Sequence, residues 1–559
     1  MKRLLFVLFV VSVAFATASP ALAASRAGDA YFSFLEGYGQ AQAGKYDEAL
    51  KHYKSALALD PGSSTLKGEM ALIYVKKGEY GKAEALLQEA VKGAPKNRHS
   101  LMLLAGLYAS RDQFDKAQKL YETCVAMDKE DTEASLLLGS VLIAQKKYRE
   151  AVTIYEKVLA YNDENLMALY YAGRLQGELK NYDKARAYYE KLLSLKPNFE
   201  LALLDMATLS EIEGKLDAAV EYYKRAIQVN PAGKKARARI AAIYVQKKDY
   251  DKAISEFEKL SDLDREDLSI RENIGLLHLE KGRYEQAIQE FSLILASRPR
   301  DNKARLYLAT ALQEKGDLNR ATEEFLKIDP KTEEFQAASR SLLALYVKNG
   351  TIDDGLSQVD KLIEKNSRNV PLCLLKAALL EEKSDYPAGL KVLEAARQLD
   401  PANVELLYQL AMLYEKNGDN ATAMKYMEDI LKSEPDNANA LNFIGYSFAE
   451  RGINLDKAEQ LIKKALEKRP DDGYIIDSLG WVFYNKKDYR KALEEMLKAQ
   501  ALVSDDSVIN EHLSDVYAKL GQYEKAIEFL RQSIGLEKKE DRKKALEGKL
   551  KELEQHKRK

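Results

Sequence analysis

The stretch TEASLLLGSVLIAQKKYREAVTIYEKVLAYNDEN, residues 132–165, decides the fold of this chain. Its first half, from Glu133 to Gln145, is rich in apolar residues. Its second half, from Arg149 to Tyr161, carries apolar residues at the i, i+3, i+4, i+7 and i+8 positions of a helix: Ala151, Ile154, Tyr155, Val158 and Leu159. A short polar turn, residues 145–147, separates the halves, so we predict two antiparallel helices.

The same pattern recurs every 34 residues along the chain. A small residue marks each repeat: Ala49, Ala83, Ala117, Ala151, Ala185, Ala219, Ala253, Ala287, Ala321, Gly355, Gly389, Ala423, Ala458, Ala492 and Ala526. Only the step into Ala458 is 35 residues long. A fixed period of this length is typical of arrays of helical hairpins. We therefore predict one all-α array of 15 repeats over residues 30–540, although 559 residues would ordinarily suggest several domains.

The composition supports an elongated array and argues against nucleic-acid binding. Hydrophobic residues make up 46 % of the chain, enough for a continuous core, and 31 % of the residues are charged, which suits a large surface. The formal net charge is −1, whereas nucleic-acid-binding proteins present a basic face. We therefore expect no nucleic-acid partner.

The N-terminus has the pattern of a secretory signal peptide. Lys2 and Arg3 precede an apolar run over residues 4–16, and residues 21–23 form a small-x-small cleavage site. The apolar run is short for a membrane-spanning helix, so an uncleaved anchor, with membrane contact, is the alternative. We expect a signal peptide over residues 1–23, a mature chain beginning at Ala24, and a periplasmic or cell-envelope location in a bacterium.

Some positions recur in the repeats when each is numbered from 1 to 34, with Thr132 as position 1 of the fourth repeat. Position 15 is glycine in nine repeats, which predicts a left-handed residue ending the first helix: Gly44, Gly78, Gly214, Gly282, Gly316, Gly350, Gly418, Gly452 and Gly521. Positions 8 and 20 are small, which we attribute to the close approach of two backbones.

These positions resemble the tetratricopeptide repeat. That family has a small residue at position 8, Tyr at 11, Ala at 20, an aromatic residue at 24, a small residue at 27 and Pro at 32. The second repeat shows the pattern, with a leucine in place of the aromatic residue: Ala71, Tyr74, Ala83, Leu87, Ala90 and Pro95. The resemblance covers residues 30–540, and it implies a right-handed superhelical solenoid whose first helices line a concave groove.

The ends of the array and two repeats depart from the pattern. Residues 24–29 are expected to form a short linker before the first repeat. Pro330 falls at position 29 of the ninth repeat, so the second helix of that repeat should end early. The thirteenth repeat has one extra residue in its turn, within residues 452–456. After the last repeat, residues 541–559 are predicted to form a basic capping helix.

The sequence offers no chemistry for catalysis. The five histidines are scattered, and no pair has the helical spacing of metal ligands. Motifs for a zinc protease, a serine nucleophile or a phosphate-binding loop are missing from the sequence. We therefore predict that the protein is not an enzyme, and we name no catalytic residue, cofactor site or metal site.

The candidate site is a group of aromatic and polar residues in repeats thirteen to fifteen. By the geometry of the family, positions 2, 5, 9 and 12 face the groove. The chain's only Trp stands at such a position among tyrosines, amides and carboxylates, a composition typical of binding hot spots. The predicted partner-binding residues are Tyr446, Trp481, Tyr484, Tyr474, Asn439, Asn442, Asp477, Asn485 and Glu511. The sequence leaves open whether Trp481 is exposed in the groove or buried by its neighbours.

Two functions follow from this pattern. We expect a non-catalytic scaffold or assembly factor of the bacterial cell envelope that binds a protein or peptide partner along the groove. The alternative is a factor in exopolysaccharide or cell-envelope glycan export, which would bind a glycan. A glycan platform would need stacked aromatic residues along several consecutive repeats, and the groove positions carry them only at the two ends of the array.

Overall fold

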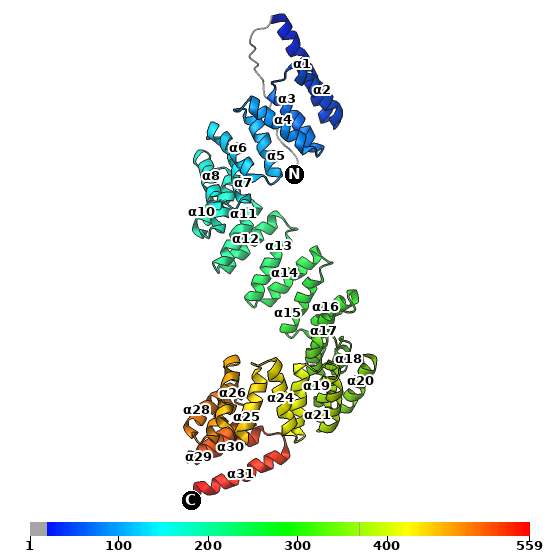
Figure 1. The fold of residues 1–559 in the computed structure, drawn as a ribbon, viewed down its shortest axis with the longest axis vertical. Helices are drawn as coiled ribbons and strands as arrows, with labels where there is room; N and C mark the ends of the chain where they lie inside the picture. The colour runs from blue at the N-terminus through cyan, green and yellow to red at the C-terminus, as the bar shows by residue number, and fades with distance from the viewer. Residues whose placement is uncertain (1–19, 368, 559) are drawn as a thin grey trace. The chain divides into compact units, whose positions relative to one another are not determined.

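The computed structural model describes residues 20–367 and 369–558 (Figure 1), and within them every regular element is an α-helix. The chain divides into two compact units, unit 1 ending at Ile270 and unit 2 beginning at Arg271. Most of the predicted signal peptide, residues 1–19, lies outside the described residues. The all-α prediction is confirmed.

The helices have the following bounds. Unit 1 contains α1 (Pro20–Gln42), α2 (Tyr46–Leu59), α3 (Ser64–Lys76), α4 (Tyr80–Gly93), α5 (Arg98–Ser110), α6 (Phe114–Met127), α7 (Thr132–Ala144), α8 (Tyr148–Tyr161), α9 (Leu166–Glu178), α10 (Tyr182–Leu195), α11 (Glu200–Ile212), α12 (Leu216–Val229), α13 (Lys234–Gln246) and α14 (Tyr250–Leu263). Helix α15 (Leu268–Glu280) includes the boundary between the units. Unit 2 continues with α16 (Tyr284–Ser297), α17 (Asn302–Lys315), α18 (Leu318–Leu326), α19 (Glu334–Asn349), α20 (Ile352–Lys365), α21 (Val370–Glu382), α22 (Tyr386–Arg397), α23 (Val404–Lys416), α24 (Asn420–Ser433), α25 (Ala438–Glu450), α26 (Leu455–Lys468), α27 (Gly473–Asn485), α28 (Tyr489–Leu502), α29 (Ser507–Lys519), α30 (Tyr523–Leu536) and α31 (Glu540–Arg558).

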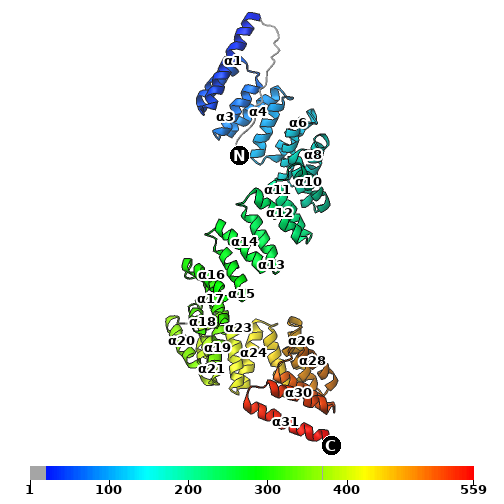
Figure 2. The same cartoon turned by 180° about the vertical axis from the view of Figure 1, so that it is seen from behind.

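Each repeat is a hairpin of a first helix, called A, and a second helix, called B. In the fourth repeat these are α7 and α8, whose bounds lie within one residue of the prediction. The odd-numbered helices from α1 to α29 are the A helices, and the even-numbered helices are the B helices. Within each unit, successive hairpins lie side by side (Figure 1, Figure 2).

The turn inside every repeat contains a residue in the left-handed region at position 15. The nine predicted glycines have φ between 63° and 92°. In the six other repeats, residues with side chains adopt φ between 57° and 64° at the same position: Asp112, Lys146, Lys180, Lys248, Ser384 and Lys487. The following N–H then returns to the helix, as when Lys147 N donates to the Leu142 carbonyl at 2.8 Å. The predicted cap is confirmed, and it also forms where no glycine is present.

Position 8 is small because both the backbone and a side chain of the B helix lie close to it. A Cβ atom added to Gly445 or Gly480 would lie 3.2 Å from the Ala458 carbonyl oxygen or 3.4 Å from the Ala492 carbonyl oxygen, both at position 20, so the two backbones approach closely as expected. A Cβ atom added to Gly139 would lie 2.4 Å from the Tyr155 ring, and one added to Gly275 would lie 2.8 Å from the Phe291 ring. Tyr155 occupies position 24 of the repeat that contains Gly139, and Phe291 occupies position 24 of the repeat that contains Gly275. Both side chains are fully buried. In these two repeats the nearest neighbour of position 8 is therefore the ring at position 24 of the B helix.

The irregular repeats follow the predictions. Helix α18 has 9 residues where α16 has 14, because the chain reaches Pro330 soon after Leu326. The extra residue of repeat thirteen is absorbed by a second left-handed residue, Asn454, with φ 48°. The predicted cap is helix α31, which lies beside α30 in both views and buries Leu546 (Figure 1, Figure 2).

The N-terminal end of the array is more helical than we expected. Helix α1 begins at Pro20 and has 23 residues, so residues 24–29 are helical rather than a linker. Proline suits the first turn of a helix because its missing N–H needs no partner there. Over residues 20–367 and 369–558, no helix is long and apolar enough to cross a membrane.

The shortened α18 should make its surroundings open more readily than a regular repeat. We expect the amides of α18 and α19 to exchange hydrogen faster than those of α7 and α8, because α18 lacks its last turn and contacts its neighbour less. Hydrogen exchange read by mass spectrometry checks this. Equal protection in the two regions would show that the early end of α18 does not weaken the array.

Candidate functional site

The nine predicted site residues lie on three consecutive A helices of unit 2. Helix α25 carries Asn439, Asn442 and Tyr446, helix α27 carries Tyr474, Asp477, Trp481, Tyr484 and Asn485, and helix α29 carries Glu511. Helix α27 contacts both α25 and α29 directly. The structure thus brings the candidate residues together on one surface, which we call the A-helix face.

A stack of rings forms the centre of this face. The Trp481 ring lies between Tyr484, at a centroid distance of 4.6 Å and an interplanar angle of 3°, and His512, at 4.0 Å and 17°. Tyr446 lies on the same histidine, with centroids 6.5 Å apart. The rings of Tyr446, Trp481 and Tyr484 are half-buried. They therefore pack between repeats and still present an edge to solvent.

Beneath the rings lies a buried ion pair that the sequence did not point to. His512 Nδ1 is 2.8 Å from Asp477 Oδ2, and the two residues are 6 % and 5 % exposed. Burial disfavours a charged imidazole, but the carboxylate of Asp477, together with those of Asp515 and Glu511, more than offsets this, so the pKa of His512 is raised. Asp477 occupies position 5 of repeat fourteen, and His512 occupies position 6 of repeat fifteen. Because A helices of consecutive repeats are neighbours, comparing these positions between adjacent repeats could have revealed the pair from the sequence.

The polar side chains among the nine candidate residues differ in their hydrogen-bond partners. Asn439 accepts a hydrogen bond from Arg469 at 2.9 Å, and Asn485 donates to the Trp481 carbonyl at 3.0 Å. The Glu511 carboxylate is paired with the capping helix α31, because it accepts hydrogen bonds from Arg542 at 3.1 Å and from Lys549 at 3.0 Å.

Three polar atoms near the stack are buried and make no hydrogen bond within the described chain: Asn442 Oδ1, Asp477 Oδ1 and Trp481 Nε1. Tyr474 differs from all these residues, since its side chain is 55 % exposed. Of the nine candidates, Tyr474 offers the most accessible ring.

Two glutamates extend the face toward α23, and the sequence analysis missed them. Burial raises the pKa of the Tyr446 hydroxyl, and the nearby carboxylates of Glu450, Asp477 and Glu415 add to this. Burial also raises the pKa of Glu415, and the like charge of Glu450 raises it further. Neither glutamate forms an ion pair with the described residues.

The A-helix face is hollowed further along unit 2. A pocket of about 420 Å³ lies over α19, α21 and α23. Its lining is about half apolar and half polar and includes Leu343, Leu374, Ala378, Arg340, Glu405 and Gln409. This mixture suits a peptide better than a purely polar ligand.

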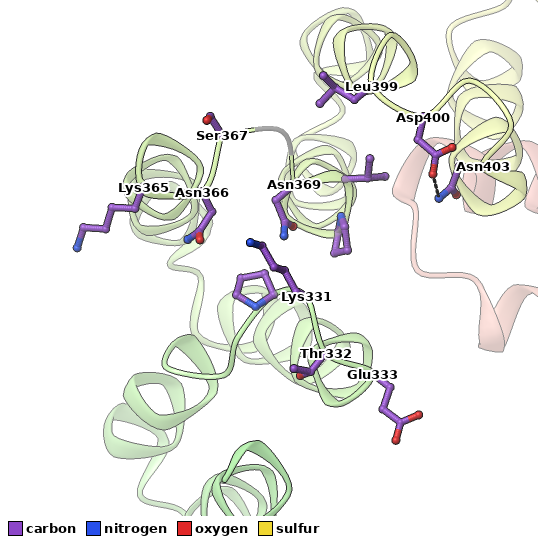
Figure 3. A pocket seen from close by; sticks show the side chains of 13 residues that line it. Lys331, Thr332, Glu333, Lys365, Asn366, Ser367, Asn369, Leu399, Asp400 and Asn403 are labelled. Carbon is purple, nitrogen blue, oxygen red and sulfur yellow. Dashed lines mark hydrogen bonds between the residues drawn. The ribbon is translucent and has the colours of Figure 1, made fainter. Parts of the chain in front are cut away.

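A second pocket, of about 780 Å³, lies where the connections before α19, α21 and α23 meet. Figure 3 shows the side chains of Lys331, Asn366 and Asn369 turned toward one another across it. Asp400, at its edge, accepts a hydrogen bond from Asn403 at 3.0 Å. The pocket has neither a histidine nor a cysteine in its described lining, and it carries no recognisable catalytic set.

The described residues contain no group of three or more His, Cys, Asp and Glu side chains that could hold a metal ion. The partially exposed groups of the A-helix face are rings, amides and carboxylates. Such a face can bind and orient a partner, and it has no nucleophile paired with a base.

Models of the tetratricopeptide repeat match much of the chain. One matches residues 40–107, 212–271, 278–346 and 379–445, and a second matches residues 509–540. A model described as anaphase-promoting complex, cyclosome, subunit 3 matches residues 76–158 and 110–192. The matches extend over both units.

The individual proteins similar to this chain either have low sequence identity to it or match only a short segment of it. A TPR repeat-containing protein of Pseudomonas aeruginosa is 35 % identical over 75 residues, which are 13 % of this chain and 12 % of that protein. The structure of Naa15/Naa10 bound to HypK is 15 % identical, with 94 % of this chain and 96 % of that chain covered and a TM-score of 0.35. The Cut9–Hcn1 hetero-tetramer is 14 % identical, with 86 % and 95 % covered and a TM-score of 0.36.

Replacing Trp481 by alanine should destabilise unit 2. The ring is stacked on both sides, so Trp481→Ala should lower the free energy of unfolding by about 2–3 kcal/mol. Tyr474→Ala is the matched control and should change it by less than about 0.5 kcal/mol. Denaturant unfolding followed by circular dichroism measures both, and equal effects would show that the Trp481 ring does not pack.

The buried histidine should make stability depend on pH. A raised folded-state pKa means that the contribution of His512 is fully present below its ordinary value, about 6.5, and is lost as the pH rises through the raised value. The stability advantage of the natural chain over His512→Gln should therefore be larger near pH 6 than near pH 9. An advantage of the same size at both values would mean that His512 is neutral in the folded chain.

Proposed function

Because this chain belongs to the tetratricopeptide repeat family, we propose that it is a non-catalytic scaffold that binds a protein partner through the A-helix face of unit 2. The repeat fold itself supports a role in protein–protein interaction. The choice of surface rests on one observation, which is that rings, amides and carboxylates of three consecutive repeats meet on α25, α27 and α29.

The geometry of this face suits a protein segment. An exposed ring at Tyr474 and the half-buried edges of Tyr446, Trp481 and Tyr484 offer apolar contact. The pocket over α19, α21 and α23 continues the same face, so an extended or helical segment could contact several repeats at once. Aromatic anchors surrounded by polar groups are the usual source of binding energy in such contacts.

A glycan ligand is less well supported. Carbohydrate platforms need rings that lie open to solvent along consecutive repeats. Among the four aromatic candidates of the A-helix face, three are half-buried and only Tyr474 is exposed. We therefore keep the protein partner as the proposal.

We extend the proposal to the location of the protein. The basic residues, apolar run and small-x-small site within residues 1–23 support export, and with it a place in the bacterial cell envelope. A partner would then be met in the periplasm or at the envelope surface.

One experiment tests the surface and the location together. A photo-crosslinking amino acid replaces Tyr474, or replaces Tyr161 of α8 as a control of similar exposure, 53 %. Illumination of living cells should join a partner to the chain at position 474 and not at position 161. Mass spectrometry of the adduct should also find the mature N-terminus at Ala24.

Crosslinks of equal yield at the two positions, or none at position 474, would contradict the proposed surface. A chain that still begins at Met1 in membranes would contradict cleavage and favour the anchor.

A further inference from the structure

The pocket of about 780 Å³ in unit 2 lies where helices begin, and the partner-binding residues do not line it. Its volume is in the range of pockets that hold small molecules. The connection between α18 and α19, residues 327–333, is long because α18 ends early, and it supplies one wall. The connections before α21 and α23 supply the others. The early end of α18 thus leaves a space at the start of three A helices.

The electrostatics of this pocket favour an anion. Helices α19, α21 and α23 begin at its walls, and the N-terminus of a helix carries a partial positive charge. The amine of Lys331 adds a full charge, because it forms no ion pair with the described residues and is turned into the pocket in Figure 3. The two carboxylates of the lining do not neutralise this amine. Glu333 points away from it in Figure 3, and Asp400 accepts a hydrogen bond from Asn403 at 3.0 Å.

A buried amide without a hydrogen-bond acceptor faces the same space. Asn369 is the N-cap of α21 and is only 8 % exposed. Its side-chain oxygen accepts from the Leu372 N–H at 3.0 Å, which fixes the side-chain nitrogen on the other side. That nitrogen makes no hydrogen bond with the described residues, and Figure 3 shows the side chain turned toward Lys331. A donor buried to this degree costs free energy unless a ligand or a water accepts its hydrogen bond.

The third side chain at the centre of the pocket supplies an acceptor. Asn366 donates through its side-chain nitrogen to the Leu362 carbonyl at 3.1 Å, so its side-chain oxygen remains available. The pocket therefore offers a charged donor, a neutral donor and an acceptor. A phosphate group matches this set, because its oxygens can accept from Lys331 and Asn369 while one of them, near neutral pH, still carries a proton to donate. Sulfate has no such proton, and Lys331 would repel a metal cation.

We propose that this pocket binds a phosphate group, which is held between Lys331 and Asn369 and donates its hydroxyl to Asn366. Free inorganic phosphate and a phosphate monoester share this chemistry. The pocket is larger than one phosphate ion, which leaves room for the rest of an ester. The site does not depend on the protein partner proposed above, because none of its residues lies on α25, α27 or α29.

The test uses the full natural chain, inorganic phosphate as the probe, and isothermal titration calorimetry in a buffer free of phosphate and sulfate. Phosphate should bind saturably. Its affinity should fall about tenfold or more in Lys331→Gln, because a charge-assisted hydrogen bond is lost. The matched control Lys365→Gln makes the same charge change in the same lining and should leave the affinity unchanged, since Lys365 points away from Lys331 in Figure 3.

A second variant, Asn369→Asp, tests the buried amide. Aspartate caps a helix as well as asparagine does, so α21 should keep its N-cap while a carboxylate that repels phosphate replaces the amide donor. Phosphate binding should be lost. Asn165→Asp makes the same change at the N-cap of α9 in unit 1 and should leave phosphate binding unchanged. Circular dichroism checks that each variant folds.

Glycerol 3-phosphate distinguishes the two sources of the phosphate group. Tighter binding of this ester than of inorganic phosphate shows that the ligand is an ester, and equal or weaker binding shows that it is the free anion. Absence of saturable phosphate binding, an equal loss of affinity in Lys365→Gln, or unchanged binding in Asn369→Asp would overturn the inference. Sulfate that binds as tightly as phosphate would overturn it as well.

Discussion

In the repeats whose position 8 is glycine, the contact of a large position-24 side chain of the B helix with that small residue of the A helix holds the hairpin together. Gly139 faces Tyr155 in one repeat, and Gly275 faces Phe291 in another. The large partner is fully buried in both cases. A larger residue at position 8 would have to displace that ring, so the two positions can change only together.

The residues that pack inside a repeat are different from those that form the A-helix face. Positions 8, 20 and 24 supply the packing inside a repeat, whereas positions 5, 9 and 12 of successive A helices meet between repeats. In repeat fourteen these outer positions carry Trp481, Tyr484 and Asp477 rather than simple aliphatic residues. The result is a face whose side chains serve packing between repeats and contact with a partner at the same time.

Much of the fold could be predicted from the sequence, because the repeat period fixes helix length and register by local rules. The bounds of α7 and α8, the left-handed turns and the early end of α18 before Pro330 all depend on residues close together in the chain. The burial of Trp481 and the pairing of Asp477 with His512 depend on how neighbouring repeats meet. Such contacts join residues about one repeat apart, and composition alone does not reveal which way those side chains turn.

Hydrogen exchange of the full chain, with and without its crosslinked partner, tests most directly whether the A-helix face of unit 2 is the binding surface. Partner contact should slow exchange in α25, α27 and α29 and leave the B helices α24, α26 and α28 unchanged. Protection confined to the B helices, or to unit 1, would contradict the assignment of the A-helix face.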